Sequence, residues 1–118
     1  DIYDANAISS DYVVQLSMEE VCLGGVFYPL HEWLDFLIKG DQSHGFYRPY
    51  AVDNGGVAPE PWHLSFSPLA SICEETISLD IIKSALANAA RDKKLELYST
   101  ISENIDEIFN RFITSSPE

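Results

Sequence analysis

Turn-forming residues divide this chain of 118 residues into short segments. A Gly-Gly pair at positions 24–25 breaks the chain early, and Gly40 follows the first long apolar segment. The Asn-Gly-Gly run at positions 54–56 is a strong turn signal, and Pro68 ends the last segment that alternates as a strand does. The stretch from Gly40 to Pro68 therefore has room only for short strands, and longer elements are expected on either side of it.

Two stretches carry apolar residues at helical spacing. Pro29 opens the first, where its missing N–H costs nothing, and Gly40 stops it. Ser78 can cap a later helix, and a second apolar stripe predicts an amphipathic helix that runs to about residue 112 and serves for packing. The stripe positions are Phe27, Leu30, Leu34 and Leu37, and then Leu97, Ile101, Ile105, Ile108 and Phe112.

The predicted strands are short. Residues 1–4 are expected to end a strand, and residues 11–16 alternate weakly. Residues 46–50 are aromatic, with Pro49 favouring an edge strand or extended loop, and residues 62–66 alternate as a further strand. A few short strands with helices before and after them indicate an α+β fold, in a single domain over residues 1–118.

Charge and cysteine content restrict the partners. A net charge of −12 argues against nucleic acid, which needs a basic patch, and against an anionic membrane surface. No apolar run is long enough to span a bilayer. Cys22 and Cys73 are the only cysteines, which is too few for a disulfide framework. They also lack the CxxC spacing of zinc and redox sites. Both are expected to be buried as small hydrophobic residues, with one bridge between them as an alternative.

Three histidines are candidates for chemistry. His31 lies on the predicted helix and is expected at its surface or boundary, and His44 lies in a predicted turn that could face a cleft. His63 follows Glu60 by three positions, with Pro61 between them. A bend at this proline can turn both side chains toward one cleft, where imidazole can bind zinc and a carboxylate can act as a general base. The alternative is a structural histidine that bonds a backbone carbonyl.

The motif "GFYRPY", followed by a glycine turn and "EPWH", resembles the C-terminal motif of the VanY-like D-alanyl-D-alanine carboxypeptidases. These zinc peptidases are related to D-Ala-D-Ala dipeptidases and to the hedgehog signalling domain. "HEWLDFL" is similar to the helix that leads into the motif, and "DIYD" at the start looks like the end of the family's first motif. The resemblance implies a small antiparallel sheet with flanking helices, as in the hedgehog and DD-peptidase folds.

Site residues follow from this resemblance position by position. Glu60 matches the catalytic base, His63 the last zinc ligand and Asp1 the aspartate ligand of the first motif. Arg48 and Tyr50 fall near the cleft without an assigned catalytic role. The family's histidine ligand stands seven residues before its aspartate, so its counterpart would precede Asp1. Residues 1–118 are therefore expected to form the C-terminal portion of a catalytic domain that is incomplete at its N-terminus.

The implied function is zinc-dependent hydrolysis of a D-amino-acid peptide bond in peptidoglycan stem peptides, with Zn²⁺ as cofactor and the bacterial cell envelope or periplasm as its place. One alternative is a non-catalytic module on the same fold that binds a peptide or a protein. Another is a small acidic domain in which "EPWH" is only a rigid turn. The sequence sets neither the oligomeric state nor the choice among carboxypeptidase, dipeptidase and endopeptidase action.

Overall fold

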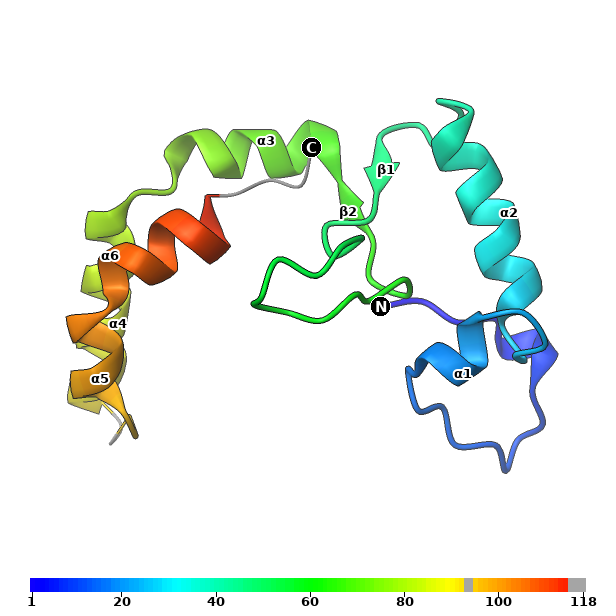
Figure 1. The fold of residues 1–118 in the computed structure, drawn as a ribbon, viewed down its shortest axis with the longest axis horizontal. Coiled ribbons are helices and arrows are strands. Elements are labelled where there is room, and N and C mark those ends of the chain that lie inside the picture. Colours follow the sequence, from blue (N-terminus) through cyan, green and yellow to red (C-terminus); the bar gives the residue numbers. More distant parts are fainter. Residues whose placement is uncertain (93–94, 115–118) are drawn as a thin grey trace. The chain divides into compact units, whose positions relative to one another are not determined.

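The computed structural model describes residues 1–92 and 95–114, which divide into two compact units, Asp1–Pro68 and the described residues from Leu69 onward (Figure 1). Helices accompany one small two-stranded antiparallel sheet, so the fold class is α+β as predicted. The resemblance to a zinc peptidase fold and the single domain stay predictions. Within the described residues, no helix combines the length and apolar character needed to cross a bilayer.

The elements of the first unit are short except for one helix. Phe27, directly before helix α2, is buried at 1% exposure. Its ring packs against the rings of Tyr3 and Tyr12. Pro29 lies in the first turn of α2 and Gly40 ends the helix, as predicted. The bounds are η1 Ala5–Ala7, α1 Met18–Val21, α2 Tyr28–Lys39, β1 Phe46–Tyr47 and β2 Ser65–Phe66.

The sheet is a short ribbon of two strands with two residues each. β1 pairs antiparallel with β2, and the rings of the paired Phe46 and Phe66 lie 5.1 Å apart. The pairing is extended by one hydrogen bond at the end of the ribbon, where the Gly45 carbonyl accepts the N–H of Ser67 at 2.8 Å. Among the described residues, the strands predicted at residues 1–4 and 11–16 do not form, and the one predicted at residues 62–66 is reduced to its last two residues. Asp4 instead caps η1 by accepting the N–H of Asn6.

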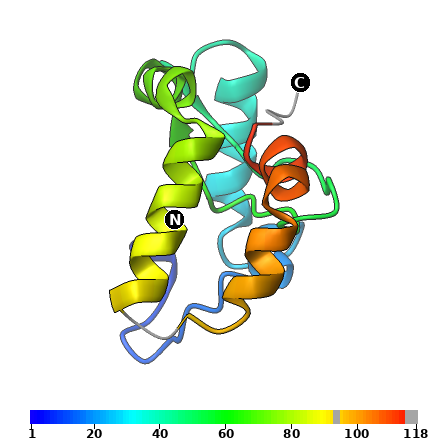
Figure 2. The same cartoon turned by 90° about the vertical axis from the view of Figure 1, so that its left-hand side faces the viewer.

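The second unit is helical in its described part. α4 follows Ser78, whose hydroxyl oxygen accepts the N–H of Ile81 at 3.3 Å, as the cap prediction required. α4 contacts α5 and α6 (Figure 2). Ile105 of α6 is buried at 3% exposure. The bounds are α3 Ser67–Thr76, α4 Leu79–Asp92, α5 Tyr98–Glu103, α6 Ile105–Ile108 and the π-helical turn η2 Phe109–Ile113.

The single helix predicted from the second apolar stripe is divided. Asn104 separates α5 from α6, and its side-chain amide donates to the carbonyl of Thr100 at 2.8 Å. A short polar side chain that bonds the local backbone competes with regular helical hydrogen bonding. Ile105 of the stripe is buried at 3% exposure, but Leu97 precedes α5 and is 73% exposed, so the stripe predicts part of the packing face and overestimates the length of the helix.

A buried carboxylate organises the segment before α1. Glu20 is 5% exposed, and it accepts hydrogen bonds from the Tyr12 hydroxyl and from the backbone N–H groups of Gln15 and Ser17. Burial alone would raise the pKa of Glu20, but these hydrogen bonds outweigh burial and hold the pKa below its ordinary value of 4.5. The loop from residue 12 to residue 17 is thus closed around one charged group.

This geometry predicts a specific pH dependence of stability. Because the pKa of Glu20 is lower in the folded state, its stabilisation is present above the ordinary pKa and is lost as pH falls through the folded-state pKa. Glu20→Gln should therefore lower the urea midpoint at about pH 6 and reduce its fall between about pH 6 and about pH 3.5. Glu19→Gln, at the exposed neighbouring position, is the control and should keep the wild-type pH dependence.

Candidate functional site

Glu60 and His63 lie at the two ends of a four-residue turn. The N–H of His63 donates to the carbonyl of Glu60 at 3.0 Å, and Pro61 occupies the second position, which its fixed φ favours. The turn directs both side chains to one side, with His63 Nδ1 3.7 Å from Glu60 Oε2. The bend predicted from the proline is therefore present, and it brings the two residues together.

Asp1 reaches the same place from the start of the chain. The N–H of Ile2 donates to the carbonyl of Trp62 at 3.0 Å, which lays the first residues beside the turn (Figure 1). Asp1 Oδ1 then lies 3.1 Å from His63 Nδ1. The three residues predicted for the site therefore converge on one imidazole nitrogen.

The electrostatics of this cluster favour a cation. Two carboxylates, from Asp1 and Glu60, face a nitrogen that can carry only one proton or one lone pair. Carboxylate oxygen and imidazole nitrogen are both zinc donors. The side chains of Asp1, Glu60 and His63 are 47%, 31% and 37% exposed, so water can reach them. Over residues 1–92 and 95–114, however, no three His, Cys, Asp or Glu side chains already form a metal-binding group.

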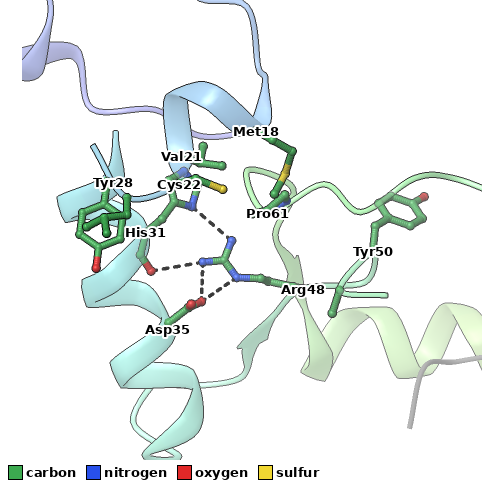
Figure 3. Close-up of a pocket in the computed structure, with 11 residues that line it drawn as sticks. Met18, Val21, Cys22, Tyr28, His31, Asp35, Arg48, Tyr50 and Pro61 are labelled. Atoms are coloured by element: carbon green, nitrogen blue, oxygen red, sulfur yellow. Dashed lines mark hydrogen bonds and ion pairs between the residues drawn. The ribbon is translucent and has the colours of Figure 1, made fainter. Parts of the chain in front are cut away.

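The other two histidines take different positions. His44 is exposed in a turn with a φ of 53°, as predicted for that loop. His31 was expected at the surface or boundary of the helix, and this was wrong, because the residue is buried at 4% exposure. It faces Arg48, which packs against α2 and covers the imidazole (Figure 3).

Arg48 connects β1 to α2. Its guanidinium donates to Asp35 Oδ1 at 2.8 and 3.1 Å, to His31 Nδ1 at 3.2 Å and to the His31 carbonyl at 3.4 Å (Figure 3). The Arg48 side chain is 11% exposed, so its charge is paired and largely shielded from water. A cavity of about 480 Å³ lies beside this pair, and Tyr50 and Pro61 contribute to its lining.

The protonation of His31 follows from Arg48. Arg48 has no acceptor, so the contact uses the lone pair on His31 Nδ1 and leaves the hydrogen on Nε2. Burial, and then the nearby Arg48 charge, lower the pKa of His31, which keeps the imidazole neutral, while Asp35 acts in the opposite direction. His31 Nε2 is buried and has no partner among the described residues.

Tyr50 contacts both ends of the "EPWH" turn. Its carbonyl accepts the N–H of Glu60 at 3.0 Å. Its ring lies edge-on to that of His63, with centroids 4.9 Å apart and planes at 69°. From the resemblance, Tyr50 was expected near the cleft without a role, because nothing in the local sequence pattern shows which side chain its ring meets.

The cysteine prediction was wrong. Cys22 and Cys73 are both free and exposed rather than buried. Cys22 follows α1 directly, where the chain turns back toward α2, and its side chain lines the cavity beside Arg48. Burial depends on contacts that the spacing of two cysteines does not encode.

Comparison with known proteins gives one weak similarity. The chain is 28% identical over 115 residues to an uncharacterized protein of Haemophilus influenzae, an alignment that covers 96% of this chain and 82% of that protein. No family model matches the chain, and no solved structure matches it significantly. The function must therefore be argued from the residues of the site.

Proposed function

We propose that this chain carries the general base and two zinc ligands of a zinc-dependent peptidase of the VanY-like D-alanyl-D-alanine carboxypeptidase type. The observation that carries the proposal is the convergence of Asp1, Glu60 and His63, although the first lies 59 positions before the second in the chain. The proposed substrate is a peptidoglycan stem peptide that ends in a D-amino acid. The hedgehog-like or DD-peptidase-like arrangement of the α+β fold is part of the same proposal.

Each residue has a distinct role in this proposal. His63, through Nδ1, and Asp1, through Oδ1, would hold the metal, since these atoms already face each other at 3.1 Å. A bound zinc ion would supply Lewis-acid polarisation of the scissile carbonyl and lower the pKa of a water molecule. Glu60 takes the proton of the attacking water and delivers it to the leaving amine. Its carboxylate is suited to this, because it stands beside the ligand and remains open to water.

An ordinary surface ion pair explains this cluster less well. A single exposed Asp–His pair contributes only about 0–1 kcal/mol and needs one carboxylate. Here Glu60 also turns toward the nitrogen that faces Asp1, in a chain whose net charge is already −12. Two carboxylates that face the same nitrogen attract a cation to it, and zinc is one such cation. The third protein ligand implied by the resemblance is a histidine seven positions before Asp1.

Zinc titration tests this proposal directly. Two protein ligands are fewer than the three of a catalytic zinc site, so this chain alone should bind zinc weakly, and a full-length protein that carries the upstream histidine implied by the resemblance should bind it tightly. His63→Asn should weaken binding in both. His44→Asn is the matched control, because His44 is an exposed histidine in a turn and, among the described residues, makes no hydrogen bond or ion pair with Asp1, Glu60 or His63.

Two results would contradict the proposal. Tight stoichiometric binding by this chain alone would show that the ligand set is different from the one described. A full-length protein that binds no zinc would leave a peptide- or protein-binding module as the better interpretation. Isothermal calorimetry with a competing chelator separates these outcomes, since it measures stoichiometry and affinity together.

A further inference from the structure

We propose that Tyr50 is a positioning residue, which fixes the orientation of the His63 imidazole and the place of Glu60. The inference rests on the proposed function, because it assigns a role in the same site. Tyr50 touches both residues through different parts of itself, the carbonyl and the ring. In this role Tyr50 does not touch the reacting atoms. It acts on them through Glu60 and His63.

The first contact fixes the backbone of the base. The Tyr50 carbonyl accepts the N–H of Glu60 at 3.0 Å, and the Glu60 carbonyl accepts the N–H of His63 at 3.0 Å. The start of the "EPWH" turn is thereby tied to a segment ten positions earlier in the chain. The bend alone brings Glu60 and His63 together. The hydrogen bond from Glu60 to the Tyr50 carbonyl fixes the position of this pair within the first unit.

The second contact fixes the imidazole. An edge-on ring at 4.9 Å occupies one side of His63, which is an arrangement that aromatic pairs prefer. Rotation of the imidazole about its side-chain bonds would drive it into the Tyr50 ring. The contact therefore fixes the plane of the imidazole, and within that plane Asp1 and Glu60 favour the flip that turns Nδ1 toward them.

The segment that carries Tyr50 is itself tied to helix α2. Two positions earlier, Arg48 is tied by its guanidinium to Asp35 and to the carbonyl of His31 on α2 (Figure 3). Pro49 restricts the backbone between the two residues. A continuous support thus runs from helix α2 through Arg48 and Tyr50 to the metal-facing nitrogen of His63.

Removal of this support should weaken metal binding as loss of an outer-shell partner does, by about 10- to 100-fold. Tyr50→Ala removes the ring and keeps the backbone carbonyl, whereas Tyr50→Phe keeps the ring. Tyr50→Phe should therefore stay within about twofold of wild type in zinc affinity, because the hydroxyl takes no part in the contact with His63. Tyr47→Ala, a half-buried tyrosine on β1, is the matched control.

Three measurements on the full-length protein test the inference. The first is the NMR shift of the His63 ring protons without metal, which the Tyr50 ring current displaces. The second is zinc affinity by chelator competition, and the third is the separation of kcat from KM on a peptide that ends in D-Ala-D-Ala. Tyr50→Ala should abolish the displacement, weaken zinc binding and lower kcat with little change in KM. Tyr50→Phe should restore all three.

The outcomes separate this inference from the proposed function. If Tyr50→Ala leaves the His63 ring shift and the zinc affinity at their wild-type values, the positioning role is overturned. If Tyr50→Phe fails to rescue, the hydroxyl acts and the ring contact is not the cause. If the wild-type protein binds no zinc but the ring shift still responds to Tyr50→Ala and not to Tyr47→Ala, the contact stands and the proposed peptidase fails.

Discussion

In the proposed peptidase, replacement of Glu60 by glutamine is expected to lower kcat for release of the terminal D-amino acid by about 10²- to 10⁴-fold, the usual contribution of a general base. Glutamine preserves the size and shape of the side chain but takes no proton from water. Because Asp1 and His63 are the proposed ligands, zinc affinity should change little in the Glu60→Gln protein. The measurement is released D-alanine from a D-Ala-D-Ala peptide, with the full-length zinc-loaded protein.

The control for this experiment is Glu74→Gln, at an exposed position on α3. It alters charge by the same amount and should leave turnover unchanged. If the Glu60→Gln protein keeps its turnover while it holds zinc, Glu60 is not the base. If zinc is lost instead, Glu60 is a ligand, and the assignment of roles within the cluster must be exchanged.

Replacement of Gly25 by alanine is expected to destabilise the first unit by about 1–3 kcal/mol or more, as overpacking does. A Cβ at this position would collide with the backbone carbonyls of Glu19 and Glu20. The Glu20 carbonyl also accepts the N–H of Phe27 at 2.8 Å, so it has little freedom to withdraw. The strain would be transmitted to Phe27, which is the most deeply buried side chain.

Thermal and urea unfolding measure this effect, with a fall in Tm of roughly 4–8 °C per kcal/mol for a unit of this size. Gly40→Ala is the matched control, because Gly40 has a negative φ and its nearest neighbouring atom for a Cβ is the Phe36 carbonyl oxygen at 3.1 Å. A loss of stability at Gly25 no larger than that at Gly40 would contradict the crowding argument.

The parts of the fold that were predicted correctly depend on short-range signals. Pro29 and Gly40 set the limits of α2 because proline and glycine act on the backbone within one turn. Ser78 caps α4 for the same reason. The approach of Glu60 and His63 is also local, because one hydrogen bond across a proline-containing turn produces it.

The parts that were missed depend on contacts between distant positions. His31 is buried because Arg48, 17 positions later, packs against it, and helical periodicity holds no record of that contact. Tyr50 meets His63 across a similar gap, through the loop that separates β1 from the turn. Asp1 could be placed beside His63 only by resemblance, since no spacing rule connects the first residue to the sixty-third.

The hydrogen bond from Ile2 to the Trp62 carbonyl has a consequence for the metal affinity of the proposed zinc site. Asp1 can serve as a ligand only while the first residues are docked against the turn. The apparent affinity then equals the intrinsic affinity multiplied by the docked fraction, as for any binding-competent state that is partly populated. Any change that keeps the chain end docked for longer would therefore strengthen zinc binding without adding a ligand.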